Sequence, residues 1–139
     1  MKKKKTDKRK LIEKLDAVFS QYIRLKDAQP GTGYVRCISC GAVHHWTKIQ
    51  CGHYESRGNM ATRWSERNCH PQCVACNIMQ HGNILAYRRS LVQMYGENEV
   101  NQIEVQAHST RKWSEFELDE MIKYYSALVA HLKKNKGLQ

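Results

Sequence analysis

The sequence predicts an α+β fold, with short strands and loops in the middle of the chain and helices on either side of them. Apolar side chains recur at helical spacing over residues 11–28 and again over residues 118–132. Three runs between these helices have the length and composition of short strands: residues 34–36, 42–46 and 49–54. A small mixed core flanked by helices follows from this order.

Changes in composition divide the chain into four parts. We expect residues 1–10 to be a disordered tail, because their like charges repel and nothing apolar can be buried. Residues 11–33 hold the first helix and a linker rich in proline and glycine. The core is expected at residues 34–96, and residues 97–139 form a helical extension at the C-terminus.

Local signals place the later elements. Residues 55–72 are rich in Arg, Asn and Ser, which predicts a loop. Asn83 is a candidate N-cap for a following helix that Gly96 ends, and a further helix is expected over residues 97–107. Residues 114–117 have the sequence of a capping box at the start of the last helix.

Four of the six cysteines form two matched pairs, Cys37-x-x-Cys40 and Cys73-x-x-Cys76. A C-x-x-C turn places two sulfur atoms on one side of a tight loop, and two such turns supply the four thiolates that tetrahedral zinc binds. We therefore predict a structural Zn²⁺ site. A knuckle and hairpin closed by a second knuckle at the start of a helix is a treble-clef arrangement, in which the metal replaces a large apolar core.

Positive charge is concentrated in the segment that carries the cysteines. The formal net charge is +10, and residues 34–90 contain seven Lys or Arg residues against two Glu residues. Such a surface predicts a polyanionic partner. The side chains expected to meet DNA phosphates are Arg57, Arg63, Arg67, Arg88 and Arg89.

The sequence argues against a membrane partner. No run of eighteen or more apolar residues is present, which excludes a transmembrane helix. The N-terminal lysines resemble the start of a signal peptide, but no apolar segment follows them. We therefore expect a cytoplasmic protein.

The two knuckles enclose or adjoin polar residues that a purely structural zinc motif does not need: His53, Asn68, Asn77 and His81. Hydrolysis of a phosphodiester requires a base to activate water and a cation to neutralise charge on the phosphate oxygens. A neutral imidazole suits the base. Asparagine can brace a loop or offer its carbonyl oxygen to a hard cation. His81 would share a helix face with Asn77 if the helix between them were continuous.

Three longer motifs carry a resemblance to a known family: C-G-H-Y-x-S-R-G at residues 51–58, N-x-H-P-Q-C-x-x-C-N at residues 68–77 and G-N-x-x-x-Y-R at residues 82–88. With the two knuckles, they resemble the zinc-bearing HNH (ββα-metal) endonucleases in their His-Asn-Asn variant. More narrowly, they resemble the NinG (Rap) recombination nucleases of lambdoid phages. The resemblance covers roughly residues 34–96.

This resemblance implies an activity and roles for the matching residues. The activity is endonuclease cutting of branched recombination DNA, such as Holliday junctions and D-loops, with Mg²⁺ or Mn²⁺, in the cytoplasm of the bacterial host. His53 is then the general base, Asn68 braces the loop that orients it, and Asn77 lies in the shell of the catalytic metal. The four knuckle cysteines hold the structural zinc.

One position departs from the family pattern. Many HNH enzymes place an Asp or His metal ligand directly before the base, where this chain has Gly52. The missing ligand is then His81, a carboxylate from Glu55 or Glu66, or a DNA phosphate oxygen with waters.

Other interpretations stay open. Asn68 could cap a turn and Asn77 could cap the helix after it. A rival zinc set would use Cys51, His53, Cys69 and His70. The protein could be a non-catalytic zinc-containing module that binds nucleic acid, or an adaptor whose C-terminal helices bind a recombination partner. A homodimer is also plausible, because symmetric cutting of a four-way junction needs two active sites.

Overall fold

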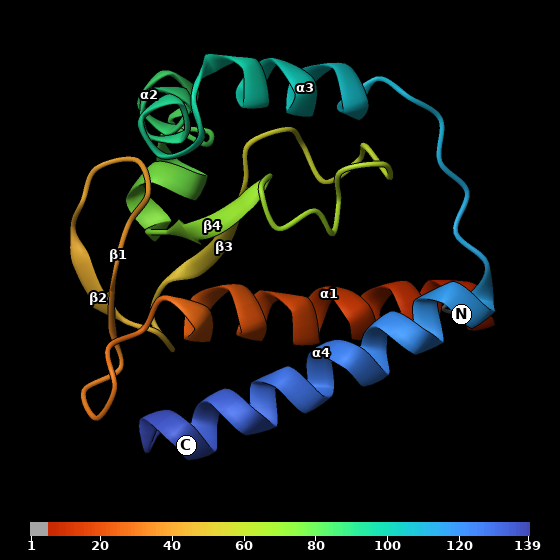
Figure 1. Ribbon diagram of the computed structural model, residues 1–139, viewed down its shortest axis with the longest axis horizontal. Coiled ribbons are helices and arrows are strands. Elements are labelled where there is room, and N and C mark those ends of the chain that lie inside the picture. Colours follow the sequence, from red (N-terminus) through yellow and green to blue (C-terminus); the bar gives the residue numbers. More distant parts are fainter. Residues whose placement is uncertain (1–5) are drawn as a thin grey trace, which may run out of the picture.

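The computed structural model describes residues 6–139, and its first helix and four strands precede three further helices (Figure 1). Helix α1 (Asp7–Lys26) leads into the strands β1 (Tyr34–Arg36), β2 (Val43–His45), β3 (Gln50–His53) and β4 (Cys69–Gln72). These are followed by the π-helical turn η1 (Ala75–Met79) and the helices α2 (Ile84–Tyr95), α3 (Glu97–Ala107) and α4 (Glu115–Lys136). The predicted α+β composition is confirmed.

The strands form two small antiparallel sheets. In the first, β1 pairs with β2, with Val35 opposite His44. In the second, β3 pairs with β4, with His53 opposite Cys69. Residues 69–72 were expected to lie in a loop, because they contain a proline, and this expectation was wrong. Pro71 needs no N–H here, and its carbonyl accepts a hydrogen bond of 2.8 Å from the N–H of Ile38, which joins the first cysteine turn to β4.

Helix α1 begins within the stretch that was expected to be disordered. The side chain of Thr6 accepts a hydrogen bond from the N–H of Arg9 at 3.2 Å, and Asp7 lies in the first turn, where its charge favours the helix dipole. Residues 7–10 are therefore helical. The rest of the predicted tail, residues 1–5, lies outside the described residues.

Two of the later helix starts differ in how they are capped. Helix α4 begins with the predicted capping box, because Ser114 and Glu117 exchange both side-chain to backbone hydrogen bonds. Asn83 does precede α2, but its side chain caps nothing. Asn83 adopts a left-handed conformation (φ 42°), and its amide donates to the sulfur of Cys76 at 3.4 Å instead.

Helix α1 lies between the β3–β4 hairpin and α4, while α2 and α3 lie on the far side of the hairpin (Figure 1). Apolar side chains of α1 pack against α4 and against the segment before β4: Leu15, Phe19, Ile23, Trp64, Cys69, Leu118, Ile122 and Tyr125. A second cluster joins α2 and α3 to the end of the hairpin: Tyr54, Tyr87, Leu91, Val100 and Ile103. No helix in residues 6–139 is long and apolar enough to cross a membrane.

Helices α1 and α4 run in the same direction, so that their C-terminal ends meet (Figure 1). Parallel packing brings two negative dipole ends together, which is unfavourable without a cation. Lys136 supplies it: its ammonium group donates to the carbonyls of Leu25, Lys26 and Ala28 at 2.8, 2.8 and 2.6 Å.

We expect Lys136→Met to lower the free energy of unfolding by about 1.5–3 kcal/mol, the usual value for hydrogen bonds to a charged group. Urea denaturation followed by circular dichroism measures it. Lys134 is exposed on the same helix, and Lys134→Met should change stability by less than about 0.5 kcal/mol. Equal effects of the two substitutions would show that Lys136 does not stabilise the helix pair.

Candidate functional site

The two cysteine pairs come together as predicted. The sulfur atoms of Cys37, Cys40, Cys73 and Cys76 all lie within 4.8 Å of one another. Burial raises the pKa of the Cys37 thiol, but the backbone N–H groups of Cys40, Cys73 and Ser39 that face its sulfur outweigh burial and lower this pKa to about 7. These four cysteines form a cluster that could hold a metal such as zinc.

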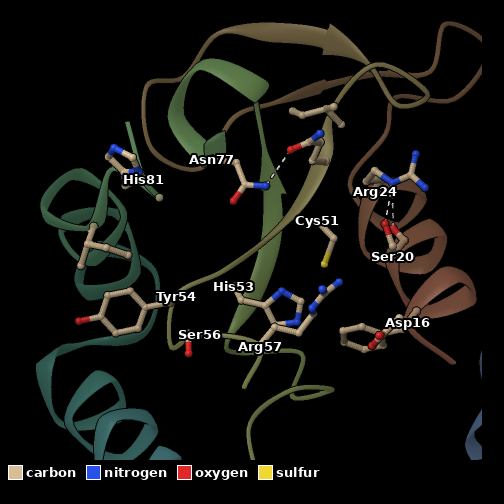
Figure 2. A pocket seen from close by; sticks show the side chains of 15 residues that line it. Asp16, Ser20, Arg24, Cys51, His53, Tyr54, Ser56, Arg57, Asn77 and His81 are labelled. Carbon is tan, nitrogen blue, oxygen red and sulfur yellow. Dashed lines mark hydrogen bonds between the residues drawn. The ribbon is translucent and has the colours of Figure 1, made fainter. Parts of the chain in front are cut away.

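A cavity of about 750 Å³ lies between α1, the strand β3, the turn η1 and the start of α2 (Figure 2). Five of the residues singled out in the sequence line it: Cys51, His53, Arg57, Asn77 and His81. Its α1 wall carries three polar side chains that sequence analysis had not singled out, Asp16, Ser20 and Arg24.

The imidazole of His53 is held in one tautomer. Its Nε2 lies 2.8 Å from the carbonyl oxygen of Arg63, which can only accept, so Nε2 carries the proton. No other hydrogen bond to this ring occurs within residues 6–139, so Nδ1 is left as a free acceptor on a residue that lines the cavity. Burial lowers the pKa of His53 below its ordinary value of 6.5, which keeps the ring neutral near pH 7.

Asn68 ties together the two ends of the loop that carries the Arg63 carbonyl. Asn68 is fully buried. Its carbonyl accepts from the N–H of Glu55 at 2.7 Å, and its amide donates to the carbonyls of Glu55 and Thr62 at 3.0 and 3.1 Å. The amide therefore fixes residues 55–62 relative to β4, and through that loop it fixes the partner of His53.

Asp16 braces the same loop from α1. Its carboxylate accepts from Arg63 Nε at 3.0 Å and from Trp64 Nε1 at 2.9 Å, and it forms an ion pair with the Arg63 guanidinium. Sequence analysis missed this residue, although a signal exists. Asp16 lies beside Leu15 and Phe19, on the apolar side of α1, where an acid needs a partner.

A third brace comes from α2. The hydroxyl of Tyr87 donates to the carbonyl of Gly52 at 2.7 Å, directly before His53, and lies 3.1 Å from Nδ1 of His70. The other ring nitrogen of His70 lies 2.8 Å from the hydroxyl of Tyr95. Burial lowers the pKa of His70 to about 4. Because both of its nitrogens are occupied, His70 does not join the rival zinc set expected with Cys51, His53 and Cys69.

Asn77 and His81 both line the cavity, but they do not share the face of one continuous helix, as had been expected. The helix between them is not continuous, because η1 ends at Met79 and His81 adopts a left-handed conformation (φ 51°). Asn77 lies inside η1, so it is not an N-cap. Its amide donates to Gln50 Oε1 at 2.8 Å, and its side-chain carbonyl oxygen has no hydrogen-bond donor in the described part of the chain. Figure 2 shows Asn77 and His81 on the wall above His53. Non-glycine residues with positive φ are uncommon and cluster at functional sites.

Crowding explains why glycine precedes His53. A Cβ atom on Gly52 would lie 2.6 Å from the Cβ of Gln72 and would collide with the carboxamide of that residue. The two carboxylates suggested as replacement ligands are elsewhere. Glu66 accepts hydrogen bonds from Tyr22 and Tyr125, and Glu55 is not part of the cavity wall.

The five predicted arginines separate into different environments. Arg57 is exposed and lines the cavity. Arg63 differs from the expectation, because Asp16 engages its guanidinium and its side chain is 15% exposed, so it is structural. Arg67 pairs with Glu99, Arg88 pairs with Glu104, and Arg89 is exposed; none of these three lines the cavity.

The fold and this site define a small α+β protein with a four-cysteine cluster able to hold a metal, beside a cavity lined by histidine, asparagine and arginine. The family model described as "Bacteriophage Lambda NinG protein" matches residues 1–135. The chain therefore belongs to the NinG family of lambdoid phage proteins, as its motifs indicated.

Relatives in several phages carry the name protein ninG. The chain is 28% identical over 127 residues to the protein of Escherichia phage lambda and to that of Salmonella phage P22, which covers 91% of this chain and 59% of each relative. For Enterobacteria phage H19B the identity is 31% over 104 residues, 74% of this chain and 48% of the relative. The chain thus spans about half to three fifths of the length of these relatives. No solved structure matches it significantly.

We expect the protein to purify with zinc on the four-cysteine cluster. Cys37→Ser should remove one zinc ion per chain and abolish the cooperative thermal transition of the core, because metal binding is coupled to folding in such small segments. Mass spectrometry of the metal and calorimetry measure the two effects. His108→Ala, which is exposed and outside this cluster, is the matched control; equal zinc on Cys37→Ser and the control would contradict the assignment.

The tautomer of His53 gives a second test. Nitrogen-15 correlation spectra should show the Nε2–H form at neutral pH, because the Arg63 carbonyl accepts a hydrogen bond from Nε2–H. On acidification the ring should gain its second proton below pH 6.5, since burial lowers its pKa. A ring protonated at Nδ1 at neutral pH would show that this hydrogen bond does not form. Titration above pH 6.5 would show that burial does not dominate the pKa of His53.

Proposed function

We propose that this protein is a metal-dependent DNA endonuclease of the HNH (ββα-metal) type. The observation that carries this proposal is the fixed tautomer of His53: Nε2 is occupied by the Arg63 carbonyl, and Nδ1 remains free in the wall of the cavity. A purely structural histidine would have no need of a free, neutral ring nitrogen beside an open cavity.

Nδ1 of His53 takes a proton from a water molecule in the cavity. The water oxygen forms a bond to phosphorus, and the bond from phosphorus to the leaving oxygen breaks. The leaving oxygen keeps the bonding electron pair and takes a proton from a solvent water molecule. A base with a pKa near or below the working pH is neutral and ready to accept, which the lowered pKa of His53 provides. Asn68 and Asp16 act as positioning residues, because both hold the loop that carries the Arg63 carbonyl.

A divalent cation would supply charge stabilisation for the phosphate in this cavity. The protein oxygen available to it is the Asn77 carbonyl, and His81 offers an imidazole. Among residues 6–139, no unpaired carboxylate lines the wall, since Asp16 is engaged by Arg63 and Trp64. A sparse set of protein ligands suits Mg²⁺ or Mn²⁺, because Mg²⁺ usually keeps several waters and takes further oxygens from the substrate phosphates.

DNA is the substrate that the charge favours. The exposed Arg57 lies in the same cavity as His53, where it would pair with a phosphate, and the chain carries a net charge of +10. From the resemblance to the recombination nucleases we propose branched DNA as the preferred form, cut in the cytoplasm of the bacterial host. Two copies acting together would provide the two incisions that a four-way junction requires.

The test compares a labelled four-way junction with a linear duplex of the same sequence, with Mg²⁺ or Mn²⁺ present or withheld. We expect metal-dependent cutting of the junction. His53→Ala should lower the rate by about 10²–10⁴-fold, the usual contribution of a general base, while DNA binding is unchanged.

His44→Ala is the matched control, because His44 lies on β2 of the same core and does not line the cavity. It should cut as the wild type does. If the wild type and His53→Ala bind DNA equally and neither cuts any form of it, the protein is a zinc-containing binding module. If His53→Ala and His44→Ala both cut at the wild-type rate, the base lies elsewhere.

A further inference from the structure

Three potential metal ligands lie together outside the four-cysteine cluster. The sulfur atoms of Cys51 and Cys69 and a ring nitrogen of His53 all lie within 4.8 Å of one another. The strand register produces this group: His53 is directly opposite Cys69, and Cys51 precedes His53 by two residues on the same face of β3. The hairpin therefore presents two thiols and one imidazole on the side that faces α1 and the cavity.

The chemistry of this group matches a thiophilic cation. Thiolate and imidazole ligands are preferred by Zn²⁺, whereas Mg²⁺ and Mn²⁺ prefer oxygen. In a tetrahedral zinc site the ligand atoms are roughly 3.5–3.8 Å apart, given Zn–S and Zn–N bonds of about 2.3 and 2.0 Å. Small rotations of the three side chains would bring their ligand atoms, now within 4.8 Å of one another, to this separation.

The three side chains are covered on all sides except the one that faces the cavity. Cys69 is fully buried, and its sulfur lies 3.6 Å from the Arg63 carbonyl. Cys51 and His53 are half-buried and line the cavity, where Figure 2 shows them next to each other. A cation would enter from the cavity and would have three protein ligands with the fourth position open to water, a pattern known from zinc sites that are not purely structural.

We propose that Cys51, His53 and Cys69 form a second metal site, which takes one Zn²⁺ ion in addition to the ion on the four-cysteine cluster. Its occupation sequesters the imidazole of His53, so that zinc at this site blocks DNA cleavage. The binding of the second ion stands on the geometry alone, and its inhibitory effect rests on the proposed function.

Binding is tested on the purified protein with its first zinc site filled, kept reduced and dialysed against excess Zn²⁺. We expect two zinc ions per chain for the wild type and one for Cys51→Ser and for His53→Ala. Cys51→Ser is preferred over a change at the fully buried Cys69, and His53→Ala provides a second variant should Cys51→Ser fold poorly. The exposed His108 provides the matched control, and His108→Ala should bind two ions.

Cobalt distinguishes this site from weak surface binding. With Co²⁺ in place of Zn²⁺ at the second equivalent, we expect additional sulfur-to-cobalt charge-transfer absorption that is absent in Cys51→Ser. A wild-type protein that binds one zinc ion, or a second ion that both variants retain, would overturn the proposed site.

Inhibition is tested in the junction-cutting assay with Mg²⁺, by adding Zn²⁺ up to and beyond the second equivalent. Each protein is compared with its own rate before zinc is added. We expect wild-type cutting to be lost as the second site fills and cutting by Cys51→Ser to persist. If the second ion binds and cutting continues, the inhibitory role is wrong although the site stands. If no DNA is cut even without added zinc, the proposed function fails, and the binding measurement still decides the site.

Discussion

The rest of the core depends on one constraint, the close approach of the two cysteine pairs. Cys40 of the first pair and Cys73 of the second are 33 residues apart in the sequence. Bringing together two residues this far apart in the sequence costs conformational entropy. The strands between the two pairs have only three or four residues each. Two sheets of that size bury little apolar surface and are marginal by themselves. Holding Cys40 and Cys73 within 3.7 Å fixes where β1 ends and where η1 begins, and so fixes the frame on which β3 carries His53.

Inside that frame, the position of one imidazole is determined by three elements that are far apart in the sequence. Asp16 of α1 holds Arg63, Asn68 holds the ends of the intervening loop, and Tyr87 of α2 holds the carbonyl before His53. Each contact is made by a buried or half-buried polar group, so the loss of one partner would leave another unsatisfied. Helices α1 and α2 therefore help to position the site, although most of the candidate metal ligands lie in the chain segment between these two helices.

The sequence was informative wherever a short local pattern determines structure. Matched C-x-x-C spacing predicted the cysteine cluster, periodicity predicted the helices, and the motif around His53 led to the cavity. It was uninformative where a tertiary contact decides. Pro71 hid a strand because its register with Cys51 is set by chain segments that meet only in the fold. The role of Asp16 depends on Arg63 and Trp64, 47 and 48 residues away, and no periodicity encodes that pairing.

The crowding at Gly52 has a consequence for how such a site can change over time. A side chain at position 52 meets Gln72, and Gln72 itself donates to the carbonyl of Gly82 at 2.6 Å and to Ser39 Oγ at 2.9 Å. Neither position is free to vary alone. A larger residue 52 requires a smaller residue 72, and a smaller residue 72 would lose the hydrogen bond to the carbonyl of Gly82, just before α2. The two positions are therefore epistatic. A larger residue at position 52 is therefore tolerated only together with a change at position 72.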